Sequence, residues 1–127
     1  MHEVSNEQWF AWAVQALAQN AATRIGLYPS FVAVGHELAV DHDDAYRSFM
    51  QVSAGLLSES QREAVTALDN QLQYMTDLGD EELWDWQGVE ERIEWAKVRM
   101  LANTALEVLG WDSTPPPKER GSIYISG

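Results

Sequence analysis

Residues 58–79 read SESQREAVTALDNQLQYMTDLG, and this stretch predicts a helix together with both of its ends. Ser58 and Gln61 have the spacing of a capping box, in which each side chain satisfies a backbone N–H at the helix start. Gly79 is a residue type that commonly ends a helix. Between these ends, apolar residues recur every three or four positions, at Val65, Leu68, Leu72, Met75 and Leu78. We therefore expect an amphipathic helix that buries one face.

The same signals predict three more helices, over residues 5–25, 30–57 and 80–109. Ser5, Ser30 and Asp80 are their expected N-caps. Two places could split a helix: the acidic run at residues 41–44, and Gly88, which lowers helix propensity. Four helices with short connections are typical of an all-α, antiparallel four-helix bundle. That bundle is the predicted fold.

The end of the chain differs from the rest because Thr114 is followed by three prolines, which cannot continue a helix. We expect residues 1–111 to form the helical bundle domain. Residues 112–127 are expected to form an extended, Pro-rich tail that could dock on the bundle.

The chain has 20 acidic and 8 basic residues, a formal charge of −12, and no cysteine. The missing cysteines exclude disulfides and thiolate zinc sites. The sequence shows neither a secretory signal nor a membrane-spanning apolar run, so we expect a cytoplasmic protein without a membrane partner. The charge repels nucleic acid phosphates and favours a basic protein partner, although excess negative charge also simply keeps small proteins in solution.

The first predicted helix has no charged residue from Gln8 to Thr23. A helix that is apolar nearly all round is either central in its own domain or covered by another chain. The sequence leaves both arrangements open. It therefore suggests a homodimer through this helix, with a central helix as the alternative.

Potential metal ligands crowd together only at His36, Glu37, Asp41, His42, Asp43 and Asp44. On a continuous helix the two histidines lie roughly 120° apart, so they cannot close one tetrahedral zinc site. We therefore predict no metal, and no cofactor, for the protein. His42 falls on the apolar stripe, where a half-buried histidine with one hydrogen-bond partner is expected, and Asp43 and Asp44 are expected to pair with Arg47.

Residues 80–98, DEELWDWQGVEERIEWAKV, hold three of the six tryptophans and seven acids. On a helical wheel Trp86 joins the core stripe, whereas Trp84 and Trp95 share the opposite side. An apolar strip edged by carboxylates has the composition of a recognition surface. The predicted partner-binding residues are Trp84, Trp95, Asp85, Glu90, Glu91 and Glu94. Alternatively, the helix packs on both sides, or a break at Gly88 separates the two rings.

The acids of this stretch also allow an enzymatic interpretation. Glu90, Glu91 and Glu94 form an EExxE pattern that resembles all-α MazG-like nucleotide pyrophosphohydrolases, in which a second helix carrying ExxD follows. The resemblance implies a Mg²⁺-dependent hydrolase that uses these three residues with Asp85. Here, however, the ExxD pair comes first, and both pairs lie in one predicted helix.

No serine, histidine and acid order, phosphate-binding glycine loop or dinucleotide fingerprint occurs in the sequence, so we predict no catalytic residues. The charge and the predicted strip favour a small acidic protein-binding module. We expect an inhibitor, antitoxin or immunity-type protein that occludes a basic effector such as a nuclease. The hydrolase and a non-catalytic structural subunit or adaptor are the alternatives.

Overall fold

The computed structural model describes residues 5–28 and 33–118. Within them the chain forms six α-helices and two short 3₁₀ turns and no β-strand, which confirms the predicted all-α class. In chain order the elements are α1 Asn6–Ala18, α2 Ala21–Gly26, α3 Val34–Ser53, η1 Ala54–Leu56, α4 Glu59–Asp77, η2 Glu81–Leu83, α5 Trp86–Glu91 and α6 Ile93–Leu109. The predicted helix start at Ser30 and the predicted tail beyond residue 118 lie outside the described residues.

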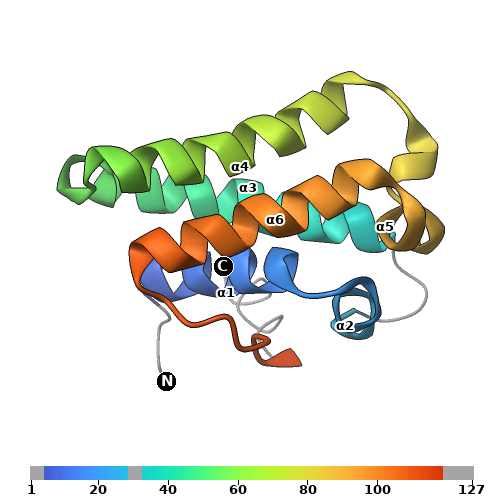
Figure 1. Ribbon diagram of the computed structural model, residues 1–127, viewed down its shortest axis with the longest axis horizontal. Coiled ribbons are helices and arrows are strands. Elements are labelled where there is room, and N and C mark those ends of the chain that lie inside the picture. Colours follow the sequence, from blue (N-terminus) through green and yellow to red (C-terminus); the bar gives the residue numbers. More distant parts are fainter. Residues whose placement is uncertain (1–4, 29–32, 119–127) are drawn as a thin grey trace.

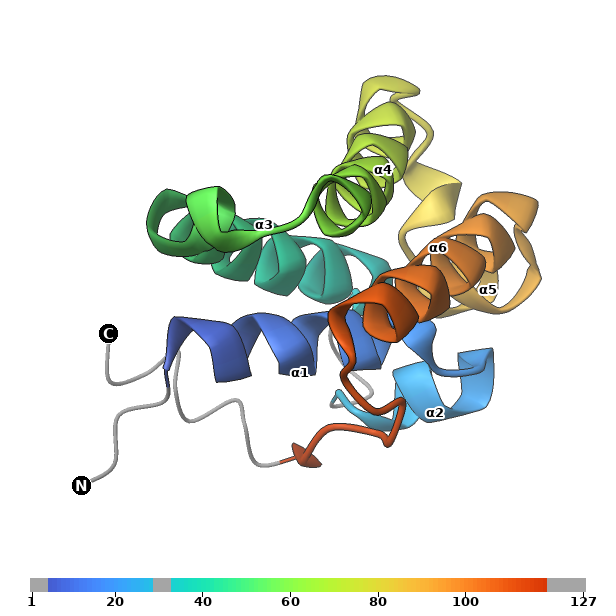
Figure 2. The ribbon, with the colours of Figure 1, turned by 60° about the vertical axis from the view of Figure 1, so that its left-hand side comes forward.

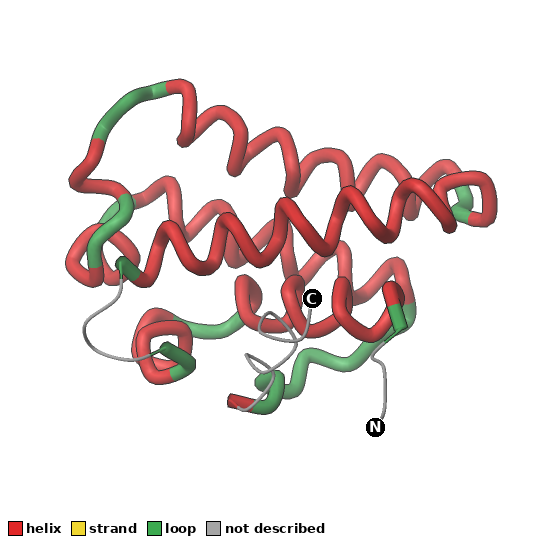
Figure 3. The backbone as a smooth tube through the Cα atoms, turned by 180° about the vertical axis from the view of Figure 1, so that it is seen from behind, coloured by secondary structure: helices red, strands yellow, loops and turns green. Residues whose placement is uncertain are grey.

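The four longer helices, α1, α3, α4 and α6, alternate in direction along the chain (Figure 1). α4 packs along α6, and α1 packs against both α3 and α6, whereas α3 and α4 contact each other far less. In a view turned by 60°, α4 and α6 are inclined to α1 and α3 (Figure 2). The short helices α2 and α5 lie together at one end of the molecule (Figure 3). A regular antiparallel four-helix bundle is therefore not confirmed and stays a prediction.

α4 forms as the sequence predicts. Ser58 and Gln61 make both hydrogen bonds of the capping box, Gln61 N donating to Ser58 Oγ at 3.1 Å and Ser58 N to Gln61 Oε1 at 2.9 Å. Gly79, just beyond the helix end, has a φ of 66°, which is strained for any residue with a Cβ. Local backbone chemistry thus sets both limits of α4.

α1 is buried over most of its length, at Phe10, Ala11, Ala13, Val14, Gln15, Ala16, Leu17 and Ala18. α3 and α6 pack against it, and the segment after α6 covers it further. The central position that the sequence left open therefore accounts for the uncharged stretch without a second copy of the chain. The homodimer through α1 stays a prediction. Within residues 5–28 and 33–118, no helix combines the length and apolarity needed to cross a membrane.

The first predicted helix is interrupted, contrary to expectation. α1 ends at Ala18, and Gln19 and Asn20 take extended conformations. The Asn20 side chain accepts a hydrogen bond from Thr23 N at 2.9 Å and so starts α2 as an N-cap. By contrast, α3 continues through the acidic run at residues 41–44, where a split had been left open.

Residues 80–109 do not form one helix either. The Asp85 side chain caps α5 by accepting a hydrogen bond from Gly88 N at 2.8 Å, and Arg92 is extended between α5 and α6. Gly88 lies inside α5, where a Cβ would come within 2.2 Å of the Glu82 carbonyl oxygen. The glycine is therefore required by a close backbone approach, and the breaks fall on either side of it.

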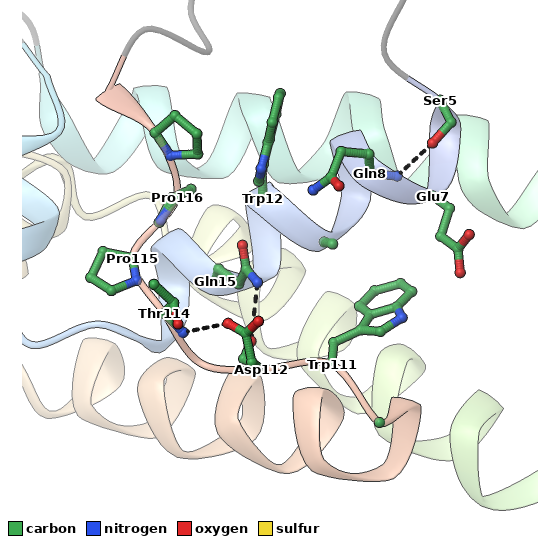
Figure 4. Close-up of a pocket in the computed structure, with 13 residues that line it drawn as sticks. Ser5, Glu7, Gln8, Trp12, Gln15, Trp111, Asp112, Thr114, Pro115 and Pro116 are labelled. Carbon is green, nitrogen blue, oxygen red and sulfur yellow. Dashed lines mark hydrogen bonds between the residues drawn. The ribbon is translucent and has the colours of Figure 1, made fainter.

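Beyond α6, residues 112–117 carry no helix and run along α1 (Figure 4). Gln15 Nε2 donates to the Asp112 carbonyl oxygen at 3.0 Å, and Gln19 Nε2 donates to the Ser113 carbonyl oxygen at 2.8 Å. Pro116 is buried in this contact. The division of the chain into a domain at residues 1–111 and a tail at 112–127 stays a prediction.

Trp95 is fully buried at the point where several elements meet. Its indole N–H donates to the Leu83 carbonyl oxygen at 2.7 Å, and its ring meets Trp84 edge to face with 5.9 Å between ring centres. The buried Arg24 guanidinium lies 5.5 Å from the Trp95 ring centre and donates to the carbonyl oxygens of Leu17 and Trp95. One side chain thus joins α6 to η2 and α2.

We expect Trp95→Ala to lower the free energy of unfolding by about 3–5 kcal/mol, because it leaves a large cavity and unpairs a buried carbonyl. Trp86→Ala is the matched control: Trp86 is 55% exposed, so its loss should cost less than about 1 kcal/mol. Urea denaturation of both variants measures the difference. Equal losses would contradict the burial described here.

Candidate functional site

The predicted tryptophan strip is wrong, because the structure reverses the two groups. Trp84 and Trp95 are 7% and 0% exposed and are covered by this chain itself, whereas Trp86, expected in the core, is 55% exposed. The physical reason is the pair of breaks at Asp85 and Arg92, which change the helical phase between the three tryptophans. The two rings therefore offer no exposed apolar strip to a partner.

The acids predicted beside that strip are also separated. Asp85 caps α5, Glu90 and Glu91 lie exposed on α5, and Glu94 lies in the first turn of α6. Glu94 Oε2 is 3.3 Å from Arg92 Nη2, and Arg92 Nη1 is 2.9 Å from Asp80 Oδ2. No group of three or more His, Cys, Asp or Glu residues that could hold a metal occurs within residues 5–28 and 33–118. The EExxE pattern is thus split between two helices.

A cleft of about 640 Å³ opens between α3 and α4, two long helices that contact each other at only a few points. The segment after α4 closes one end of it. We call this the α3/α4 cleft, and its lining consists of His36, Ala39, Val40, His42, Asp43, Asp44, Arg47, Asp69, Leu72, Gln73, Thr76, Gly79, Glu81 and Trp84. Large clefts with converging polar groups and shifted pKa values are the usual location of binding sites.

The closed end of the cleft depends on a close contact between α3 and η2. Gly35 N donates to the Trp84 carbonyl oxygen at 2.9 Å, and a Cβ on Gly35 would lie 2.7 Å from that oxygen. Only glycine therefore allows this approach without a shift of the backbone. The next residue, His36, is exposed, and its ring stacks on Trp84 with 5.1 Å between ring centres, which gives the cleft an aromatic end.

The cleft is predominantly negative. Among the described residues that line it, four carry carboxylates, namely Asp43, Asp44, Asp69 and Glu81, and Arg47 is the only arginine or lysine. Arg47 forms the predicted ion pairs, a close one with Asp43 and one with Asp44 at 3.7 Å, and it is 70% exposed. The guanidinium therefore stays at the solvent side of the cleft, and the carboxylates outnumber it.

His42 departs from the prediction of a half-buried ring with one hydrogen bond. Its side chain is 1% exposed, stacks on Tyr46 at 5.5 Å between ring centres, and has Nδ1 3.9 Å from Asp69 Oδ1. That distance is too long for a hydrogen bond, and Nε2 has no hydrogen-bond partner within the described part of the chain. Burial lowers the pKa of His42 from 6.5 to about 4, although the negative charge of Asp43 opposes this shift.

The pKa of Asp69 is shifted in the opposite direction to that of His42. Burial raises the pKa of Asp69 above its usual value, and the negative charge of Asp43 raises it further, while Arg47 partly opposes both effects. Burial thus favours the neutral form of both neighbouring groups, the fully buried His42 and the partly buried Asp69, which is 30% exposed. A cation that entered there would stabilise the charged form of Asp69.

Sequence reasoning found half of this site. It singled out the run from His36 to Asp44 as chemically dense. It did not find Asp69, which comes from α4. The one available signal was an acid directly beside Leu68 on the apolar stripe of that helix.

Comparison of the chain with known proteins finds no matching protein family, and no similar curated protein or solved structure. The geometry and charge of the α3/α4 cleft are therefore the best guide to function.

The buried His42 makes stability depend on pH. The pKa of His42 is about 4 in the folded protein and 6.5 in the unfolded chain. Its contribution to the free energy of unfolding is therefore complete above about pH 6.5 and is lost as the pH falls toward 4. One unit of pKa shift corresponds to about 1.4 kcal/mol. Over this pH range the free energy of unfolding of wild type should therefore fall by about 3 kcal/mol more than that of His42→Gln. The raised pKa of Asp69 changes stability with pH in the opposite direction. Both proteins keep Asp69, so the difference between them reports His42.

Chemical denaturation at several pH values measures this difference. The control is His36→Gln, which removes an exposed histidine from the same helix in place of the buried one. Parallel profiles for wild type and His42→Gln would show that His42 titrates normally in the folded protein.

Proposed function

We propose that this protein binds a basic protein partner and that the α3/α4 cleft receives a cationic side chain of that partner. The observation that carries the proposal is the charge of the cleft, four carboxylates against one guanidinium that remains at its exposed side. A partly desolvated negative cleft attracts cations more strongly than an open surface does, because the charges there are less screened.

The remainder of the surface supports the same choice of partner. The formal charge of −12 extends the negative potential well beyond the cleft. Asp85, Glu90 and Glu91, which the sequence assigned to a partner surface, are exposed and add to that potential. Such a field increases the rate of encounter with a positive partner, and close contacts in the cleft then determine how long the complex lasts.

An inhibitor, antitoxin or immunity-type protein that occludes a basic effector is the function that fits this arrangement best. Nucleases are a natural class of effector, since the positive surface with which they bind phosphates would face the carboxylates of this protein. In this proposal the acids replace the nucleic acid backbone at the effector surface, and the protein itself binds no nucleic acid.

The charge of the cleft is tested with two triple variants of equal charge. Asp43→Asn, Asp44→Asn and Asp69→Asn together remove three carboxylates from the cleft, whereas Glu59→Gln, Glu63→Gln and Glu107→Gln remove three exposed ones outside it. We expect the first to weaken binding of a labelled lysine-rich peptide by about tenfold or more, and the second by less than about threefold. Fluorescence anisotropy at physiological salt gives both affinities.

Equal weakening by the two triple variants would mean that net charge alone attracts the peptide, and the cleft would be rejected as the binding site. The inhibitor role has its own test. A basic protein that is retained on immobilised wild type and lost on the cleft variant is purified, and its activity is measured with increasing amounts of this chain. Stoichiometric loss of activity supports an inhibitor, whereas unchanged activity identifies an adaptor.

A further inference from the structure

The floor of the α3/α4 cleft contains a histidine without the hydrogen bonds that buried polar groups normally make. His42 is 1% exposed, and no hydrogen bond to its ring is found among the described residues. The ring atom that is buried without a hydrogen-bond partner among them is Nε2, and such an atom is costly to bury. Nδ1 faces Asp69 across 3.9 Å, so the incomplete group lies beside the most buried carboxylate of the cleft.

From this geometry we infer that the cleft floor is a binding site for a primary ammonium group, supplied by a lysine side chain of the basic partner. The ammonium nitrogen would donate to Asp69 Oδ1 and to His42 Nδ1 together. This inference rests on the proposed function and specifies the group that enters the cleft.

The spacing of the two acceptors suits a single nitrogen. At 3.9 Å they are too far apart to bond each other, yet one nitrogen between them can lie within hydrogen-bond distance of both. The acceptors come from different helices, Asp69 from α4 and His42 from α3. A bound ammonium would therefore bridge two long helices that have few direct contacts with each other.

The protonation state of His42 also suits a cation. A charged imidazolium would repel an ammonium group and has no lone pair with which to accept. Because burial holds the pKa of His42 near 4, the ring stays neutral at physiological pH. An ammonium that donates to Nδ1 requires the tautomer with the ring proton on Nε2, which stays unpaired as it is without the ligand. The gain comes from the Asp69 carboxylate, whose pKa is raised by burial and whose charged form an ammonium would stabilise.

The wall of the cleft matches the stem of lysine rather than the head of arginine. Ala39, Val40 and Leu72 line it, and Val40 is 54% exposed, so an aliphatic stem could lie along apolar surface while its tip reaches the floor. A guanidinium is a planar fork that pairs best with both oxygens of one carboxylate. The floor offers instead one carboxylate oxygen and one ring nitrogen, which diverging N–H bonds of an ammonium reach more readily.

The chain's own cation does not fill this site. Arg47 pairs with Asp43 and Asp44, and no ion pair of Asp69 with an arginine or lysine is found within residues 5–28 and 33–118. Asp43 and Asp44 are exposed. They would attract the incoming lysine, whereas Asp69 and His42 would hold its ammonium group.

The test is a titration of the full chain with three small probes, followed by nitrogen NMR of the His42 ring. The probes are lysine blocked at both ends, the same molecule acetylated on Nζ, and blocked arginine. We expect blocked lysine to bind with a dissociation constant on the order of millimolar, the acetylated probe at least about tenfold more weakly, and arginine at least about threefold more weakly. Only lysine should shift the Nδ1 signal toward that of a hydrogen-bonded acceptor.

Two variants of matched charge locate the site. Asp69→Asn should weaken lysine binding by at least about fivefold, whereas Glu63→Gln, which removes an exposed carboxylate from the same helix, should leave it unchanged. His42→Gln keeps a hydrogen-bonding side chain at this position and reports whether the ring itself is needed. Circular dichroism of each variant verifies that it is folded.

Each outcome is decisive. If blocked lysine leaves the His42 ring signals unchanged, or if arginine or the acetylated probe binds equally well, the ammonium site is wrong. If at the same time the lysine-rich peptide still depends on Asp43, Asp44 and Asp69, the proposed basic partner stands without this site. If the peptide shows no such dependence, both proposals fail together.

Discussion

The hydrogen bond from the Trp95 indole to the Leu83 carbonyl oxygen is the interaction on which the rest of the structure depends. It fixes η2 against α6, so Trp84 is turned inward, where its ring meets Trp95 on one side and His36 on the other. Through Gly35 the same segment holds the beginning of α3. The closed end of the α3/α4 cleft is therefore set by a residue that does not line it.

Arg24 also contributes to the packing around Trp95. Its buried guanidinium has backbone carbonyl oxygens of Leu17 and Trp95 as hydrogen-bond acceptors, and the Trp95 ring lies beside it. Burial, together with the nearby Arg99, lowers the pKa of Arg24 to about 10, so it remains charged at neutral pH. A positive charge at the last turn of α1 is favourable to the helix dipole and satisfies a carbonyl left unpaired where that helix ends.

Local signals in the sequence predicted what local physics decides. The capping box at Ser58 and the glycine at 79 lie where the backbone needs them, and the all-α class followed from the spacing of apolar residues. The sequence could not show that Asn20 and Asp85 start new helices, because polar residues inside a helix and at its start look alike without the surrounding packing. That ambiguity reversed the roles of Trp84 and Trp86. Asp69 was missed for another reason, since only tertiary packing brings α4 to His42.

Because α1 is covered by α6 and by residues 112–117, the order of synthesis has a consequence for folding. The uncharged helix is synthesised well before α6 and residues 112–117, which cover it. Until then Phe10, Val14 and Leu17 lack their final neighbours, and the nascent chain carries an apolar helix that can associate with other chains. Protection of this helix by chaperones during translation would thus help the chain to reach its folded state.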